Sequence, residues 1–185
     1  MGKQFPHIEA MHRDFILQQR IFFVASAAAE GRVNVSPKDG AALRILTPNR
    51  VIYLDQTGSG NETAAHLRAN GRLTIMFCAF TGAPMILRLY GQGKILRRGS
   101  AGYRDLLSEQ FPEGERPGAR HIVILEVDLV QTSCGFGVPL FEYVDERPTL
   151  TRWAIAKGEE GLEEYRQLKN AVSIDGFPAG LQERS

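Results

Sequence analysis

The stretch VNVSPK, at residues 33–38, carries the first group of side chains that could bind a ligand. Alternate side chains of a strand share a face, so three polar residues line one side: Asn34, Ser36 and Lys38. The other side carries Val33, Val35 and Pro37. An amide, a hydroxyl and an ammonium in one row can contact the carbonyl groups and phosphate of a ligand. The pattern also fits an ordinary strand whose polar face meets water, although Pro37, which cannot continue a sheet ladder, favours the ligand.

A glycine-rich turn between an expected strand and an expected helix is the second candidate. Residues 55–63 read DQTGSGNET, in which Ser59 and Glu62 fit the spacing of a capping box. A helix beginning near Gly60 would point free N–H groups and the positive end of its dipole outward. Gly58 and Gly60 would let a phosphate approach the backbone. Alternatively, this is a self-capped surface helix whose donors Glu62 already satisfies. The spacing matches neither a P-loop nor a Rossmann fingerprint.

Two isolated residues complete the candidates. Arg88 lies among apolar residues in MILRLY, where a charge is costly unless it is paired. It could meet a ligand phosphate or carbonyl, or pair across strands with Glu126 or Asp128. Phe136, in the loop SCGFGVP, could stack on a flat ring or belong to a tight turn. The cysteine and histidine spacings predict no metal site, and no residue stands out as a catalytic acid or base.

The elements that must position these residues are mostly strands. Apolar and β-branched stretches predict strands over 21–28, 33–38, 51–55, 72–80, 85–96 and 121–130. Helices are expected over 6–19, after the glycine-rich turn, over 100–111, and over 148–170 with a break at Gly158. Short connections between strands favour an antiparallel barrel. We expect a barrel domain over 1–147 and a helical appendage over 148–185, packed on that barrel or on a partner subunit.

Charge and hydropathy narrow the class of protein. The 22 basic and 21 acidic residues nearly cancel, so neither nucleic acid nor an anionic membrane is expected as a partner. The first fifteen residues lack the apolar core of a secretory signal. No apolar run approaches the roughly 20 residues that cross a bilayer. We therefore expect a cytoplasmic protein.

The candidate stretches together resemble the pyridoxamine 5′-phosphate oxidase-like family of FMN-binding split barrels. The order of FFVAS, VNVSPK, VIYLDQTGSGNETAAHL, LTIMFCAF and MILRLYG carries this resemblance over most of the chain. NVSPK, SGNETAAHL and SCGFGVP are most similar to a bacterial subgroup. The resemblance implies a mainly β (α+β) fold, a six-stranded antiparallel split β-barrel with flanking helices. It also implies a homodimer with two FMN sites at its interface.

The resemblance further implies which residues hold the cofactor, and it has gaps. Expected cofactor contacts are Asn34, Val35, Ser36, Pro37, Lys38, Asp55, Gln56, Thr57, Ser59, Gly60, Asn61 and Arg88, with Phe136 as the expected substrate contact. Gly60 and Asn61 stand where the family oxidase has a basic pair, so the phosphate would depend on Lys38, Ser59 and backbone N–H groups, with Arg88. Ile86 stands where that oxidase has glutamine, and the tail KNAVSIDGFP lacks its Arg-x-His.

These departures shape the expected function. We expect an FMN-dependent oxidoreductase that acts on an unidentified small molecule, with oxidation of vitamin B6 disfavoured. The alternative is a binding or storage module for a flavin, a deazaflavin or haem on the same barrel. A third interpretation is a barrel that kept dimer assembly and lost the site.

Overall fold

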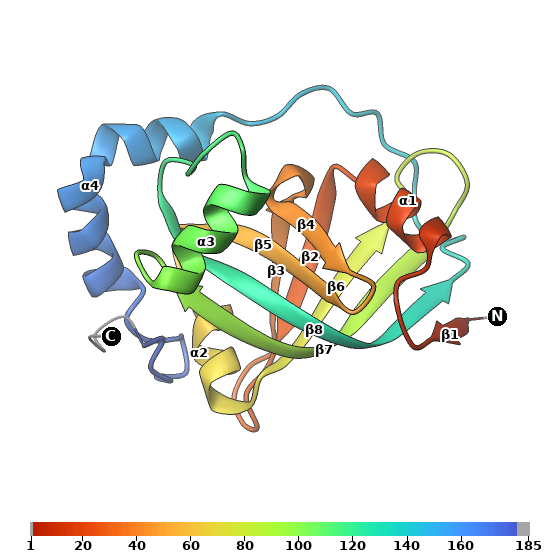
Figure 1. Cartoon of the computed structure of the whole chain (residues 1–185), viewed down its shortest axis with the longest axis horizontal. Coiled ribbons are helices and arrows are strands. Elements are labelled where there is room, and N and C mark those ends of the chain that lie inside the picture. Colours follow the sequence, from red (N-terminus) through yellow and green to blue (C-terminus); the bar gives the residue numbers. More distant parts are fainter. Residues whose placement is uncertain (1, 181–185) are drawn as a thin grey trace.

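A strongly curled antiparallel sheet forms the centre of the molecule in the computed structural model, which describes residues 2–180 (Figure 1). Its strands are β1 (Lys3–Phe5), β2 (Ile21–Ser26), β3 (Asn34–Asp39), β4 (Leu43–Thr47), β5 (Arg50–Gln56), β6 (Arg72–Cys78), β7 (Ile86–Arg97) and β8 (Ala119–Ser133). They pair in the order β3-β2-β6-β7-β8-β5-β4, with β1 added beside β8. The two end strands, β3 and β4, follow each other in sequence through a 3₁₀ turn at Gly40–Ala42. The fold is therefore the expected α+β split barrel.

The expected number of six strands was wrong, because the sheet has eight. The two strands beyond the six are β1, with three residues, and β4, with five; β4 falls on residues 43–46, where the sequence indicated only a short possible strand. Segments this short carry too few alternating positions for periodicity to separate a strand from a loop. The six longer strands all correspond to expected ones.

Alternating apolar residues explain how the sheet forms its core. In β2, Phe22, Val24 and Ser26 are buried while their neighbours are only partly so. The inner face of the curled sheet gathers such residues, including Phe22, Ile75 and Leu87, into one large cluster. Burial of this apolar surface is the main stabilising term. Helix α1 (Ala10–Gln18) adds Phe15 and Ile16 to the same cluster.

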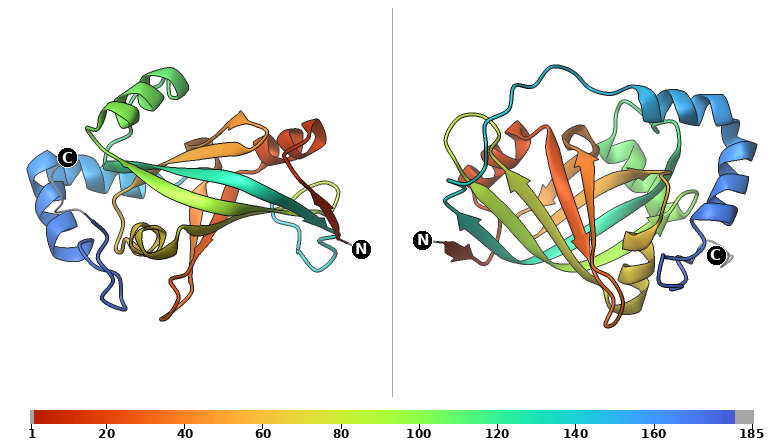
Figure 2. Two further views of the ribbon diagram at one scale, coloured as in Figure 1. Left: turned by 60° about the horizontal axis from the view of Figure 1, so that its bottom comes forward. Right: turned by 180° about the vertical axis from the view of Figure 1, so that it is seen from behind.

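Three further helices surround the sheet (Figures 1 and 2). Helix α2 (Glu62–Asn70) contacts β2, β6 and β7. Helix α3 (Ala101–Gln110) packs Tyr103 over the outer face of β5 and β8, against Ile52 and Ile122. This cover explains why β8 is buried on both faces over residues 119–125.

The last helix, α4 (Thr149–Lys169), follows a long extended segment that crosses the molecule (Figure 1). It breaks at Gly158, whose φ of 67° and ψ of 171° are not helical, as the sequence predicted. The helix rests on the barrel of its own chain: Arg166 donates to the carbonyl of Ala119, and a Cβ on Gly118 would lie 2.9 Å from the Cβ of Ala154. Within residues 2–180, none of the helices has the length and apolar character needed to cross a membrane.

Candidate functional site

A pocket of about 420 Å³ lies between β3, the end of β5 and the turn before α2; we call it the front pocket. Eight of the expected cofactor contacts line it: Asn34, Ser36, Pro37, Lys38, Asp55, Gln56, Ser59 and Gly60. These residues come from two segments that are about twenty positions apart in the sequence. The structure therefore brings the first two sequence candidates together at one place.

Strand β3 shows an inverted polarity at this pocket. Ser36 and Lys38 lie opposite Val24 and Phe22, so the polar row faces the inner side of the sheet. The apolar residues Val33 and Val35 point outward and are 71% and 59% exposed. A strand packed on an apolar core normally has the opposite arrangement, so β3 is not an ordinary strand with its apolar side on the core. Polar groups on the inner side need partners there.

The polar row is only partly satisfied by the protein itself. Ser36 Oγ donates to Asn34 Oδ1 at 3.2 Å, and Asn34 Nδ2 donates to Thr63 Oγ1 at 3.3 Å. Both contacts are long for hydrogen bonds of these types. Lys38 Nζ lies 2.5 Å from Asp55 Oδ1. The row thus keeps donors and acceptors that a ligand in the pocket can use.

Asp55 is the buried anion at the back of the pocket. Its Oδ2 lies 2.6 Å from Arg120 Nε and 3.0 Å from His121 Nε2, while its Oδ1 meets Lys38. Burial alone would raise the pKa of Asp55, but the charges of Arg120 and Lys38 outweigh burial and hold it well below its usual range. Burial lowers the pKa of His121 despite the neighbouring carboxylate. With His121 neutral, Lys38, Arg120 and Asp55 together carry one positive charge.

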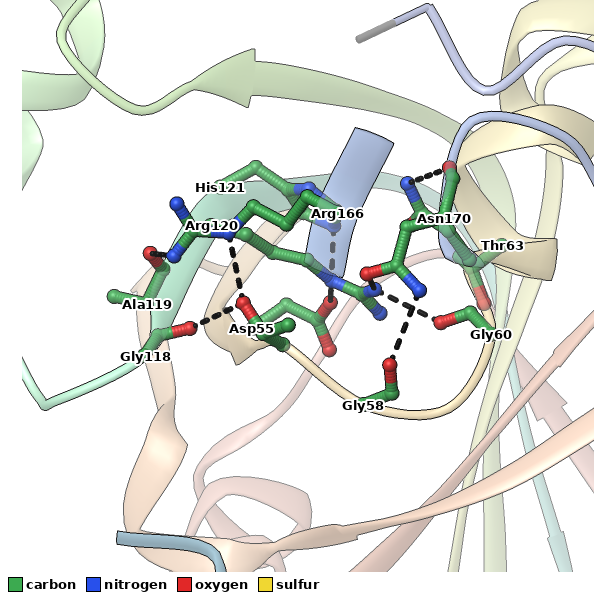
Figure 3. Close-up of polar contacts among 12 residues, drawn as sticks. Asp55, Gly58, Gly60, Thr63, Gly118, Ala119, Arg120, His121, Arg166 and Asn170 are labelled. Atoms are coloured by element: carbon green, nitrogen blue, oxygen red, sulfur yellow. Dashed lines mark hydrogen bonds and ion pairs between the residues drawn. The ribbon is translucent and has the colours of Figure 1, made fainter. Parts of the chain in front are cut away.

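The end of α4 fixes the glycine-rich turn from behind, as Figure 3 shows. Arg120 Nη1 donates to the carbonyl of Gly60 at 2.8 Å and to Asn170 Oδ1 at 2.9 Å. Asn170 Nδ2 donates to the carbonyl of Gly58 at 3.1 Å. The turn is therefore held in place by residues from β8 and the tail, neither of which the sequence candidates included.

Thr57 and Asn61, two of the expected cofactor contacts, do not line the pocket; their side chains contact β8 and the end of α4 instead. The Thr57 hydroxyl donates to the carbonyl of Gly118 and accepts from Arg166 Nε, both at 2.9 Å. Asn61 Nδ2 donates to the carbonyl of Asn170 at 3.3 Å. Both side chains are almost completely buried. Their position gives them a role in docking α4.

The expected capping box at the start of α2 was wrong. The helix begins at Glu62 with Asn61 as N-cap, and no side chain caps it. Ser59 lies too far upstream for the capping geometry, and Glu62 accepts instead from the backbone N–H of Ile174, at 3.0 Å. The interpretation of a self-capped surface helix is therefore not supported. The turn beside it is open: a Cβ on Gly58 would meet nothing within 4 Å, and one on Gly60 only Glu62 Oε1 at 3.5 Å.

Arg88, Val35 and Phe136 lie away from the front pocket. The register places Arg88 beside Met76, Met76 beside Phe23, and Phe23 beside Pro37, so Arg88 is on the outer face of the sheet with Val35. Arg88 Nη1 donates to Ser133 Oγ at 3.3 Å. The alternative partner Glu126 pairs instead with Arg50, at 2.8 Å. Phe136 is 81% exposed.

Comparisons with known proteins agree with this architecture. The sequence profile described as pyridoxamine 5′-phosphate oxidase matches residues 8–134. The pyridoxamine 5′-phosphate oxidase family protein ustO of Aspergillus flavus is 40% identical over 184 residues, covering 90% of this chain and 73% of that protein. A HupZ structure from Group A Streptococcus has a TM-score of 0.56 at 21% identity, covering 68% of this chain and 99% of HupZ.

A second solved structure supports the same fold. It is a Lactobacillus delbrueckii protein named after pyridoxamine 5′-phosphate oxidase, with a TM-score of 0.51 at 15% identity, covering 68% of this chain and 94% of the other. At such identities the two structures establish the fold alone. The profile and the fungal relative establish more: this chain belongs to the pyridoxamine 5′-phosphate oxidase family.

Proposed function

We propose that this chain binds FMN in the front pocket and serves as an oxidoreductase for a small molecule. The observation that carries the proposal is the inverted polarity of β3, which turns Asn34, Ser36 and Lys38 into the pocket. The inner side of a barrel strand is expensive for such groups unless something satisfies them. A molecule with a polar ring edge, a hydroxylated chain and a phosphate would do so along the whole row.

The donor set fits such a molecule. Asn34 and Ser36 would serve the ring edge and the hydroxylated chain, because an amide and a hydroxyl can each donate and accept. Lys38, Ser59 and the backbone of the turn would hold the phosphate. Gly58 and Gly60 leave unfilled space there, and the adjoining charged cluster carries one net positive charge. A bound flavin would supply the hydride chemistry, while the protein supplies position and hydrogen bonds.

A homodimer would explain the residues on the other face. Val33, Val35 and Arg88 lie on the outer side of β3, β2, β6 and β7, and seen from behind in Figure 2 no helix lies in front of β2, β3 and β6. Arg88 cannot meet the front pocket of its own chain, because the sheet lies between them. A second copy packed on this face would bury the exposed valines and could bring its Arg88 to the pocket.

Binding without turnover is the second candidate, and one observation favours it. The three carboxylates that line the front pocket are all engaged: Asp55 in its cluster, Asp39 with Arg116 at 2.6 Å, and Glu62 with the N–H of Ile174. None is placed to move a proton for a substrate. Haem fits the front pocket less well than FMN, because the described lining of this pocket holds no His, Cys, Met or Tyr to ligate iron.

Titration of flavin-free protein with FMN tests the proposal, followed by flavin absorbance and fluorescence. Lys38→Ala should weaken binding about tenfold or more, because it removes a charge-assisted contact. Lys3→Ala, on the exposed strand β1, is the matched control and should bind as the unchanged protein does. Failure of the unchanged protein to take up FMN, or equal affinity of the two variants, would refute the pocket assignment.

Two further measurements separate the candidates and test the dimer. Anaerobic mixing of the FMN-loaded protein with NADH or NADPH should bleach the flavin if the chain is an oxidoreductase, whereas an inert flavin favours the binding module. Light scattering after size exclusion should give twice the mass of one chain. Val35→Asp should shift that mass toward the monomer, and an unchanged dimer would refute this face as the interface.

A further inference from the structure

A second and larger cavity, of about 930 Å³, lies on the other side of the Asp55 cluster; we call it the rear cavity. Its lining residues come from α2, the end of β7, the start of α3, the start of β8 and the second half of α4. Arg120 lines both cavities, and His121 faces the rear one. The rear cavity therefore shares a wall with the front pocket.

Positive charge is concentrated around this cavity. Its lining contains six arginines and one lysine against two glutamates, although the whole chain has a formal net charge of only +1. Several of these cations have partners: Arg98 pairs with Glu115 and with Glu159, Arg120 pairs with Asp55, and Arg68 and Arg97 also make interactions of their own. Lys94, whose side chain is 60% exposed, has Glu126 as a more distant partner at 3.7 Å. Such a concentration attracts anions.

Arg166 is the cation that most needs a counter-charge. It is 6% exposed, and its closest partners are neutral: it donates to Thr57 Oγ1 at 2.9 Å and to the carbonyl of Ala119 at 3.0 Å. Its ion-pair partner, Glu163, is 3.5 Å away with a side chain that is 59% exposed, which is a weak arrangement. A second carboxylate, Glu115, also feels the charge of Arg166 but is already paired with Arg98. A buried guanidinium held by neutral acceptors favours an anion beside it.

The rear cavity also has an apolar wall, formed by Leu67, Ile95 and Leu107. A bare inorganic ion would leave this surface in contact with water, whereas an organic group would cover it. We propose that the rear cavity is a second ligand site, which takes a small phosphate-bearing organic molecule. Arg166 and Arg120 bind the phosphate at the inner end, and Lys94 and Arg104 draw it in at the mouth.

Calorimetric titration of the full chain with pyrophosphate tests this site, with salt held at about 0.15 M so that diffuse attraction is screened. The unchanged protein should bind pyrophosphate in the flavin-free state. The double variant Lys94→Gln/Arg104→Gln should bind at least about tenfold more weakly, because it removes two exposed charges from the cavity lining. Lys3→Gln/Arg13→Gln removes the same charges from exposed positions on β1 and α1 and should change affinity less than about twofold.

Arg166→Met addresses the inner end, with circular dichroism and a melting curve to verify that α4 remains folded. A folded Arg166→Met protein should lose pyrophosphate binding. Three results would overturn the proposal: no binding by the unchanged protein, equal loss in the two double variants, or undiminished binding by folded Arg166→Met.

A final arm separates this site from the proposed flavin pocket. Pyrophosphate titrated into FMN-saturated protein should still bind, with an affinity within a few-fold of the flavin-free value. Complete competition would mean that FMN and pyrophosphate share one cavity, and the second site would be refuted. The flavin-free titrations stand whether or not FMN binds, so the failure of one proposal is distinguishable from that of the other.

Discussion

Replacing Gly58 and Gly60 by alanine should separate a ligand-binding role of the glycine-rich turn from a folding role. Neither glycine has a positive φ, and a Cβ at Gly58 would meet no atom within 4 Å. A Cβ at Gly60 would meet only Glu62 Oε1, at an ordinary 3.5 Å. Alanine therefore fits both positions without strain. Each replacement should stabilise the fold by about 0.4–1 kcal/mol, because it reduces the freedom of the unfolded chain.

The double variant should thus gain about 1–2 kcal/mol, which raises Tm by about 2–8 °C for a chain of this size. Its affinity for FMN should change in the opposite direction. Both methyl groups would project into the space assigned to the phosphate, and crowding of this kind costs about 1–3 kcal/mol. That corresponds to a loss of about five- to 150-fold in affinity.

The assay is a melting curve and an FMN titration on the same samples. Gly161→Ala is the control: this glycine lies inside α4, its Cβ would come no closer than 3.5 Å to Lys157 Cδ, and helix propensity predicts a gain of about 1 kcal/mol. It should stabilise the fold without affecting FMN. A double variant that melts higher and binds FMN unchanged would show that the turn does not hold the phosphate.

Three further predictions concern the supports of the site. Asp55→Asn leaves Arg120 and Lys38 without their shared counter-charge, so urea unfolding should show a loss of about 3–5 kcal/mol; a loss below about 1 kcal/mol would contradict the buried cluster. Because the folded state lowers the pKa of Asp55, the unfolded state binds more protons in acid than the folded state does. The contribution of Asp55 to the free energy of unfolding is therefore present above about pH 4 and is lost as the pH falls toward the folded pKa. Stability measured against pH should therefore fall more steeply in acid for the unchanged protein than for Asp55→Asn, and parallel curves would argue against this. Gly118 has a φ of +78°, and a Cβ added there would lie 2.9 Å from the Cβ of Ala154. Gly118→Ala should therefore destabilise the fold by about 1–3 kcal/mol and speed limited proteolysis near residue 148. An unchanged cleavage rate would mean that α4 does not rest on this position.

The sequence predicted much of the architecture because its signals were local. The alternation of polar and apolar residues over 33–38 predicted a strand there, and β3 covers Asn34–Asp39. The break in the tail helix at Gly158 was also correct. The start of α2 fell within the expected residues, but the capping pattern was assigned to Ser59 although the N-cap is Asn61. A local motif fixes a helix start only to within a turn.

The candidate site was predicted only in part, since half of it depends on distant contacts. Arg166 meets Thr57 across 109 positions, and Asn170 meets Gly58 across 112. The family resemblance assigned Thr57 to the cofactor, and nothing in the tail sequence indicated that Arg166 would contact it instead. For Arg120 and His121 a signal did exist: two titratable residues stand at the start of the apolar strand ARHIVILEV. Charged groups there require partners, and the acidic end of β5 is the nearest strand to supply one.

The polar side of β3 can face inward because the barrel stays open beside this strand. Strands β3 and β4 are the two edges of the sheet, and the front pocket lies beside β3 where the sheet fails to close. A closed barrel would fill that inner space with apolar side chains, and the polar row of β3 would then have no room for a guest. At an open edge, the inner row can face the proposed ligand, and the exposed outer valines are available to the proposed second copy. Edge strands are normally protected against such pairing. The exposure of Val33 and Val35 is therefore best explained if ligand and partner share this strand.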